Sequence, residues 1–289
     1  MKNQRNVNAD EGFFPARDGT NIFYRVWLRD GANGCLLIHG YGDHSDRYQE
    51  LVDSISDLGY SFYAFDLRGQ GRSEGKRVFA NSLNDYVSDC FDFLKFLEKE
   101  KILDQKKKLV LLGHSLGGLI ALRVVLKDEM KWKGLVLSSP CFKLFGISWS
   151  PALRFLVKKI ARVSPGLIMT NLVRPKYLFR DPVRMEKYLK DPLVERRVTA
   201  RLANEIVKGC EEEQCRNVRL DIPVLVLASG NERVVSLDET KRWFERLQAE
   251  KKQMIVYSNL YHEIFNETGE RKPVNDLRAF LTERAGEIK

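Results

Sequence analysis

The sequence predicts an α/β fold in which a mostly parallel sheet is flanked by helices. Short continuous apolar runs recur along the chain, and helical patterns separate most of them. Continuous apolar runs are typical of parallel strands that are buried on both faces, and their alternation with helices indicates a doubly wound sheet. The expected strands are residues 22–28, 35–38, 62–65, 109–112, 134–137, 224–227 and 254–257.

Four helices are expected between and after these strands. In the first of them, the apolar residues Tyr86, Val87 and Phe91 repeat at helical spacing. The last begins with a proline, which is favoured at the first position of a helix. The expected helices are residues 83–100, 116–127, 238–248 and 273–284.

The alternation of strands and helices stops between residues 141 and 220. This stretch contains amphipathic helical pieces, has no strong strand signal, and is interrupted by Pro165, Pro175, Pro182 and Pro192. We therefore expect a core made of residues 1–140 and 221–289. Residues 141–220 are expected to be inserted in that core as a helical cap, or lid.

The net charge of +9 is concentrated on the expected cap. Residues 141–220 contain 17 Lys and Arg but 8 Asp and Glu, a surplus equal to the whole net charge. Apolar residues alternate with these charges, namely Phe145, Ile147, Trp149, Leu153, Phe155 and Ile160. A basic amphipathic helix can lie reversibly on an anionic membrane surface. The alternative is that the apolar face packs on the core and the charges are merely solvated.

Composition argues for a soluble globular protein with one sizeable core and without a structural metal site. No run of 18 apolar residues occurs and the N-terminus lacks the apolar stretch of a signal peptide, so a cytoplasmic, possibly peripheral membrane location is expected. The five cysteines include no CxxC spacing, so no metal site is expected. Nucleic-acid binding is disfavoured because the basic residues do not form a recognised module. The sequence carries no signal for an oligomeric state.

The strongest chemical signal is the GxSxG sequence Gly113-His114-Ser115-Leu116-Gly117. It stands between an apolar run and a helical pattern, which is the context that this motif requires. A sharp strand-to-helix turn exposes the serine hydroxyl, and glycines on either side avoid clashes with the strand and the helix. Ser115 is therefore the predicted nucleophile of an acyl transfer.

A second element, Ile38-His39-Gly40-Tyr41-Gly42, also follows a strand and precedes a helix. Acyl transfer needs backbone N–H donors that point at the carbonyl oxygen as it becomes an oxyanion. The N–H of Leu116, directly after the nucleophile, is one predicted donor, and the N–H of Tyr41 is the second.

The general base and the acid are expected late in the chain. Four histidines occur, and only His262 follows Ser115, so in the order nucleophile, acid, histidine it is the predicted base. The acid should follow the strand at 224–227, where Glu232 is the first carboxylate. Asp238 is the alternative, although its place at the start of the next helix also suits a helix cap.

Together these motifs resemble the monoacylglycerol lipase and lysophospholipase group of α/β hydrolases. The likeness spans about residues 12–285 and is carried by residues 39–48, 66–75, 113–117, 191–194, 233–235 and 262–263. The resemblance implies the α/β-hydrolase fold and a helical cap over an apolar acyl pocket. It also implies a serine hydrolase that cleaves carboxylic esters of single-chain lipids, monoacylglycerols or lysophospholipids, without a cofactor.

Two positions depart from the pattern of that group. The group usually has Asp where Glu232 stands, so either a longer side chain reaches His262 or the loop shifts. Asp43 replaces a common Glu in the first motif. The resemblance implies that Asp43 and Arg47 of that motif bind the polar end of the substrate.

Two further functions stay open. One is a carboxylesterase or thioesterase that acts on short soluble acyl substrates. The other is a non-catalytic ligand-binding protein on the same scaffold, for which the Glu232 departure is the only support. Labelling by a fluorophosphonate separates an enzyme from a binding protein, because it requires an activated serine.

Overall fold

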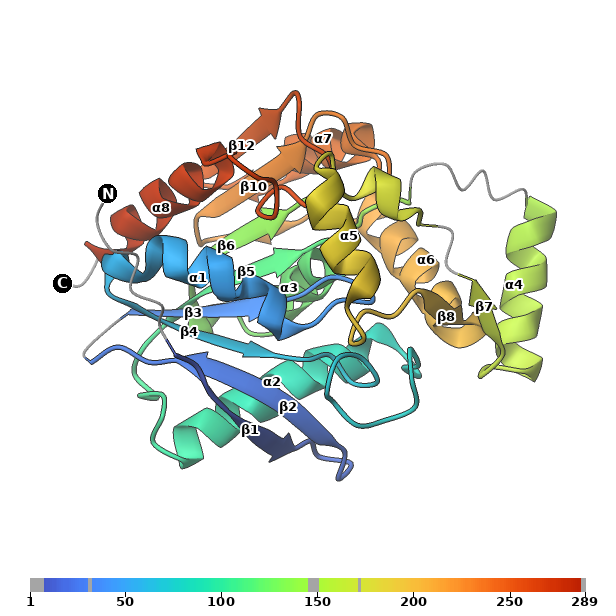
Figure 1. The fold of residues 1–289 in the computed structure, drawn as a ribbon, viewed down its shortest axis with the longest axis horizontal. Coiled ribbons are helices and arrows are strands. Elements are labelled where there is room, and N and C mark those ends of the chain that lie inside the picture. The colour runs from blue at the N-terminus through green and yellow to red at the C-terminus, as the bar shows by residue number, and fades with distance from the viewer. Residues whose placement is uncertain (1–7, 31–32, 145–150, 171–172, 287–289) are drawn as a thin grey trace.

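The computed structural model describes residues 8–30, 33–144, 151–170 and 173–286. Within these residues the centre is an eight-stranded sheet in the order β1-β2-β4-β3-β5-β6-β10-β12 (Figure 1). β2 is antiparallel to both β1 and β4, and all other neighbouring strands are parallel. The strands are β1 (Asp10–Pro15), β2 (Asn21–Trp27), β3 (Asn33–Ile38), β4 (Tyr60–Phe65), β5 (Leu109–His114), β6 (Trp132–Ser138), β10 (Val224–Ser229) and β12 (Lys252–Tyr257).

Helices cover both faces of the sheet because alternate side chains of each buried strand point to opposite faces. Leu51 of α1 and Leu281 of α8 belong to the hydrophobic cluster on one face. Leu94 of α2, Leu119 of α3 and Trp243 of α7 belong to the cluster on the other. The bounds are α1 (Gln49–Ile55), α2 (Leu83–Lys99), α3 (Leu116–Lys127), α7 (Leu237–Arg246) and α8 (Lys272–Ala285). Among the described residues, no helix combines the length and the apolar character that crossing a bilayer requires.

This architecture confirms the predicted fold class. Each expected strand is present, and each expected helix agrees within two residues at either end. The strand β1 was not predicted, because it lies at the sheet edge with mostly exposed side chains and so lacks a continuous apolar run. The helix α1 was not delimited either, since its seven residues form only two turns.

Between β6 and β10 the chain leaves the sheet and forms an insertion. Figure 1 shows its three helices beside one end of the sheet, with α4 farthest from it. Besides these helices the insertion contains β7 and β8, which pair as a short antiparallel ribbon that the sequence did not indicate. Strands of three residues are too short to produce a periodic signal in the sequence. The elements are α4 (Pro151–Val163), β7 (Ile168–Thr170), α5 (Pro182–Lys190), β8 (Arg197–Thr199) and α6 (Ala200–Cys215), followed by β9 (Arg219–Leu220), which pairs with β11 (Gln248–Ala249).

Candidate active site

Ser115 stands on the tight turn between β5 and α3. Its backbone has φ 52° and ψ −117°, a left-handed conformation that is unfavourable for a residue with a side chain. Strain of this kind costs on the order of 1–3 kcal/mol and is typical of functional turns. A Cβ on Gly113 would lie 2.2 Å from the carbonyl oxygen of Gly117, so the turn can close only with glycine at position 113.

The loop after β3 lies directly against this turn. A Cβ on Gly117 would lie 2.2 Å from the carbonyl oxygen of Ile38, and a Cβ on Gly40 would lie 3.3 Å from Cβ of Ser115. Leu116 is the first residue of α3, where backbone N–H groups have no acceptor within the helix. The structure therefore brings both residues predicted to supply the oxyanion donors, Leu116 and the neighbour of Gly40, Tyr41, to the cavity that Ser115 lines.

Glu232 and His262 form a buried pair at the carboxyl ends of β10 and β12. The His262 Nδ1 lies 2.8 Å from Oε2 of Glu232, and both side chains are 3% exposed. The other carboxylate oxygen, Oε1, accepts the backbone N–H groups of Arg233, Val234 and Val235 at 2.9, 2.8 and 3.3 Å. The loop thus folds around the longer side chain, and one oxygen is left to reach the histidine.

Glu232 and His262 each stabilise the charged form of the other. Burial alone would raise the pKa of Glu232, but the charge and hydrogen bond of His262 and the N–H groups of the loop bring it below its ordinary value. Burial alone would lower the pKa of His262, but the charge and hydrogen bond of Glu232, with a smaller contribution from Glu263, raise it above 6.5. The pairing therefore favours a protonated imidazole, as a general base requires once it has accepted a proton.

Asp238, the alternative acid, lies in the first turn of α7. The expectation that it caps this helix was wrong: the cap is Ser236, whose Oγ accepts the N–H of Glu239 at 3.2 Å. In the structure the hydrogen bond to His262 comes from Glu232.

An apolar cavity of about 290 Å³ opens beside Ser115 and His262. This volume is near the lower end of the range for ligand pockets, roughly 300–1,000 Å³. Most of its wall comes from the insertion. The apolar residues that the insertion supplies include Val157, Met169, Val173, Leu178, Val198 and Ile206.

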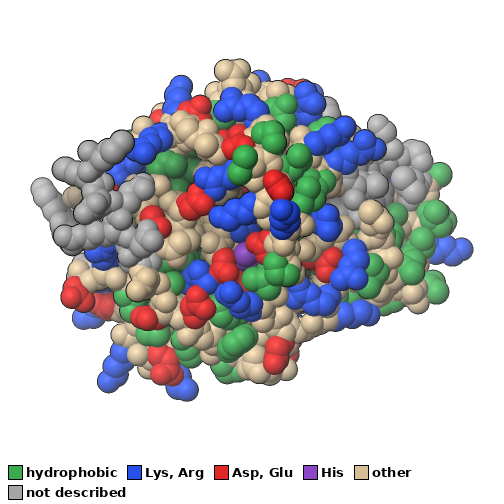
Figure 2. Space-filling model, viewed as in Figure 1, with side chains coloured by type: hydrophobic (Ala, Val, Ile, Leu, Met, Phe, Trp, Pro, Cys, Tyr) green, Lys and Arg blue, Asp and Glu red, His purple; other side chains and the backbone are tan. Residues whose placement is uncertain are grey.

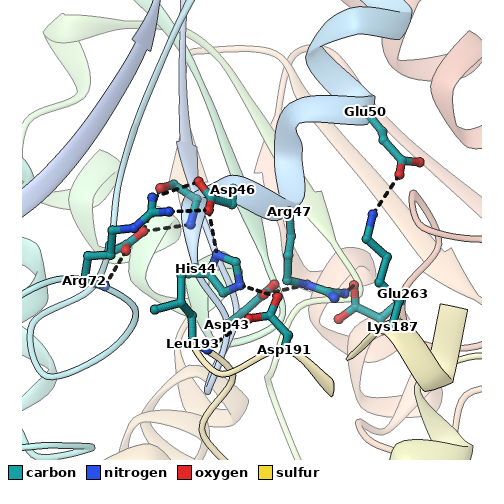
Figure 3. A network of polar contacts seen from close by, with 12 residues as sticks. Asp43, His44, Asp46, Arg47, Glu50, Arg72, Lys187, Asp191, Leu193 and Glu263 are labelled. Carbon is teal, nitrogen blue, oxygen red and sulfur yellow. Dashed lines mark hydrogen bonds and ion pairs between the residues drawn. The ribbon is translucent and has the colours of Figure 1, made fainter. Parts of the chain in front are cut away.

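The catalytic end of the cavity is polar and negatively charged. Asp43 and Glu263 line it, and Arg47 joins them through its Nε, 2.6 Å from Oδ1 of Asp43, and its Nη2, 3.3 Å from Oε2 of Glu263 (Figure 3). Burial raises the pKa of Asp43, although the charge of Arg47 opposes this shift. Arg47 is not among the described residues that line the cavity, but its guanidinium contacts two carboxylates that are.

The motifs that carry the resemblance meet around this end of the cavity. His44 Nε2 lies 2.9 Å from Oδ2 of Asp191, which ties the first motif to the insertion (Figure 3). Asp66 of the second motif accepts the N–H and hydroxyl of Ser45 at 2.7 and 2.6 Å. The side-chain oxygen of Gln70 accepts the N–H of Gly42 at 2.6 Å. The second motif therefore shapes the loop on which Tyr41 and Asp43 stand.

Sequence reasoning did not single out His114 or Glu263, although both line the cavity. Each stands next to a predicted catalytic residue within a quoted motif. That position was the only available signal, because polar side chains such as histidine and glutamate are more often exposed than buried.

Comparison with known proteins extends over nearly the whole chain. A family model described as serine aminopeptidase, S33, matches residues 32–269. The monoacylglycerol lipase of Mycolicibacterium smegmatis is 28% identical over 275 residues, which cover 94% of this chain and 96% of that protein. Phospholipase YtpA of Bacillus subtilis is 29% identical over 247 residues, which cover 85% and 93%. The crystal structure of the Paleococcus ferrophilus monoacylglycerol lipase matches with a TM-score of 0.80 and 27% identity, covering 96% of this chain and 99% of that one. These likenesses confirm the resemblance that the motifs indicated.

Proposed function

Because the chain belongs to the hydrolase family described as serine aminopeptidase, S33, we propose that it hydrolyses carboxylic esters of single-chain lipids. Ser115, His262 and Glu232 are its proposed catalytic triad. The observation that carries this proposal is the Glu232–His262 pair at the end of an apolar cavity that the strained Ser115 also lines. The similar monoacylglycerol lipases and the similar phospholipase support the substrate class.

In the proposed mechanism, Oγ of Ser115 attacks the ester carbonyl while Nε2 of His262 accepts its proton. Glu232 holds Nδ1 of the imidazole and stabilises the imidazolium. The N–H groups of Leu116 and Tyr41 donate to the oxyanion. His262 then gives the proton to the leaving alcohol, and a water molecule that the same imidazole activates releases the acyl group from Ser115.

The proposed head group is uncharged. The described residues that line the cavity include Asp43 and Glu263 but neither Lys nor Arg. The hydroxyls of a glycerol head can donate to the Asp43 carboxylate. A phosphate would be repelled, because Arg47 balances only one of the two carboxylate charges. This favours monoacylglycerols over lysophospholipids that carry a net negative charge.

Residues 141–220 are proposed to act as a lid over the acyl chain. They supply most of the apolar wall, and they reach the core through a hydrogen bond from the Tyr41 hydroxyl to the carbonyl oxygen of Arg197. The N–H of Glu195 also donates to the carbonyl oxygen of Gly42 at 2.9 Å. An acyl chain bound below this segment would be shielded from water on both sides.

A substrate panel tests this proposal. With p-nitrophenyl esters of rising chain length, kcat/KM is expected to rise about fourfold for each added CH₂ until the cavity is filled, from roughly 0.8 kcal/mol per buried CH₂. With the same acyl chain in neutral detergent micelles, kcat/KM for a monoacylglycerol is expected to exceed that for the matching lysophosphatidylglycerol by roughly 300-fold, the effect of one charge at roughly 5 Å and an effective dielectric constant near 20.

Two outcomes of the panel would contradict the proposal. A flat chain-length profile would indicate an esterase of short soluble acyl substrates. Faster cleavage of an aminoacyl p-nitroanilide than of any ester would indicate an aminopeptidase, the activity in the description of the matching family.

We further propose that α4 docks reversibly on anionic membranes. Val157 and Ala161 of this helix are buried and pack towards α6, but Phe155, Leu156 and Val163 are 68%, 50% and 78% exposed. Figure 2 shows apolar side chains together with Lys and Arg at the end of the molecule where α4 lies in Figure 1. The basic residues of the helix are Arg154, Lys158, Lys159 and Arg162. Phe145, Ile147, Trp149 and the side chain of Leu153 lie outside the described residues.

Sedimentation with lipid vesicles tests the docking. Binding is expected to favour anionic over neutral vesicles and to weaken as salt rises, because exposed charges are screened. Replacing both Lys158 and Lys159 with Gln is expected to weaken binding roughly 30-fold, from about 1 kcal/mol for each basic residue. The matched control replaces Lys106 and Lys108, which precede the amino end of β5 and lie outside the insertion, and should leave binding unchanged. Equally weak binding to both vesicle types would exclude the docking.

A further inference from the structure

Glu263, which directly follows His262, is a buried carboxylate that the proposed triad does not use. Its Oε1 lies 3.2 Å from Nε2 of His114. Its Oε2 accepts from Nη2 of Arg47 at 3.3 Å and from Nδ2 of Asn266 at 2.7 Å. Figure 3 shows Arg47 reaching this carboxylate from the segment that leads into α1. Both oxygens are thus held by donors from three separate parts of the chain.

These partners keep Glu263 charged. Burial alone would raise its pKa, but the charge and hydrogen bond of His114 and the charges of Arg47 and His262 bring the pKa well below its ordinary value. A buried carboxylate that stays ionised at neutral pH is a permanent negative charge beside the reacting groups.

His114 connects this charge to the nucleophile turn. It is the residue before Ser115, and the centre of its ring lies 5.0 Å from that of His262. Its Nδ1 lies 3.1 Å from Oγ of Ser138. The backbone N–H of Glu263 donates to the carbonyl oxygen of Leu178 in the insertion at 3.1 Å. Glu263 therefore joins the turn, the insertion and the loop that carries His262.

In the proposed mechanism, negative charge near His262 favours the step in which this residue accepts the proton of Ser115. When the nucleophile loses its proton, His262 becomes an imidazolium in a buried position, where an uncompensated charge is costly. Glu232 compensates it directly through Nδ1. Glu263 is a second carboxylate close to it, held against His114, whose ring centre lies 5.0 Å from that of His262.

We propose, on the basis of the catalytic roles proposed above, that Glu263 is a positioning residue for His262. Its carboxylate, fixed by Arg47 and His114, stabilises the imidazolium as Ser115 attacks. The groups that face His262 are Glu232, Glu263, His114 and Cys141. The groups that face Glu263 are Asp43, Arg47, Tyr48, His114, Tyr188, His262 and Asn266.

The test is the pH profile of kcat/KM for Glu263→Gln on an uncharged ester. The wild-type acid limb reports His262 and is expected above pH 6.5. Without the nearby negative charge the neutral imidazole is favoured, so the limb is expected to move down by about one pH unit, with kcat about tenfold lower. KM should stay within about twofold, because ground-state binding does not involve the imidazolium.

The matched control is Glu267→Gln. Glu267 is also a buried carboxylate, but it accepts the backbone N–H of Arg180 at 2.7 Å and does not line the cavity. Glu267→Gln should lower the melting temperature without moving the acid limb of the kcat/KM profile. Glu263→Asp keeps the charge, so its limb is expected to stay within about 0.3 pH units of wild type.

The proposal is overturned if Glu263→Gln melts cooperatively and keeps the wild-type acid limb. If Glu263→Gln does not fold, the test uses Glu263→Asp instead. A downward shift of its acid limb, although the charge is retained, would indicate that Glu263 has a purely structural role. Failure of the proposed function would appear differently. In that case Ser115→Ala would keep its activity and the pH profile would report another site.

Discussion

Replacing Ser115 with Ala is expected to lower ester hydrolysis by about 10⁵- to 10⁶-fold, the loss seen when a serine hydrolase is deprived of its nucleophile. Labelling by a fluorophosphonate should disappear as well, because it requires the activated hydroxyl. The fold should persist, since alanine removes only one oxygen and the backbone strain at φ 52° is unchanged. Activity on a p-nitrophenyl ester and a thermal melt measure these effects.

The control for this experiment is Ser88→Ala on α2, a serine that does not line the cavity. This variant should react with the fluorophosphonate and hydrolyse the ester as the wild-type protein does. Retention of most activity by Ser115→Ala would exclude Ser115 as the nucleophile. His262→Ala should be nearly as inactive as Ser115→Ala, and the two losses should not add, because the two residues act in one step.

Replacing Glu232 with Gln is expected to lower kcat by on the order of 10⁴-fold, by analogy with acid-to-amide changes in a serine protease triad. The amide keeps the shape of the side chain, but its oxygen would stay with the loop N–H groups and its NH₂ would face Nδ1 as a donor. This favours the wrong tautomer of His262 and removes the charge that stabilises the imidazolium. Without the carboxylate charge the pKa of His262 should fall, so the acid limb of the pH profile should move to lower pH.

Glu232→Asp tests how the longer acid is built into the loop. In the wild-type protein one oxygen accepts N–H groups of the loop while the other reaches His262 at 2.8 Å. A side chain shorter by one CH₂ cannot do both without a shift, so a loss of about 100-fold is expected, the usual effect of a misplacement near 1 Å. Asp238→Asn, the control at the alternative position, should be close to wild type. A nearly silent Glu232→Gln together with an inactive Asp238→Asn would reverse the assignment of the acid.

The proposed membrane-binding surface on α4 and the cavity would favour lipids of different charge. Basic residues accompany the exposed apolar side chains of α4, whereas carboxylates line the catalytic end of the cavity. An anionic membrane would therefore attract the protein, while the cavity would reject the anionic lipids that attracted it and accept uncharged ones. The vesicle and micelle experiments separate these two effects, because neutral micelles remove the surface attraction.

Much of the fold was predictable because it depends on short-range patterns. Buried parallel strands produce continuous apolar runs, and α3 begins directly after a GxSxG turn whose glycines are needed for local packing. The histidine was predictable by elimination, since only His262 follows Ser115 in the chain. The edge strand β1 and the ribbon of β7 and β8 were missed, because exposed or three-residue strands have no such pattern.

The surroundings of the triad could not be predicted in the same way. Arg47, His114 and Glu263 are far apart in the chain, and their contacts depend on how the turn before α1, the end of β5 and the loop after β12 pack together. Arg47 illustrates this, since its guanidinium pairs with the carboxylates of Asp43 and Glu263, and nothing in the sequence indicated the second contact.

By itself, the sequence determined most of the core strands and helices, the nucleophile turn and the candidates for base and acid, because periodicity and spacing within a few residues encode them. Only the tertiary structure decided that Glu232 rather than Asp238 pairs with His262. It alone also decided that Glu263 is a buried charge rather than a solvated one. The physical reason is that the charge state and reach of a carboxylate depend on its burial and its partners, and residues distant in the chain supply both.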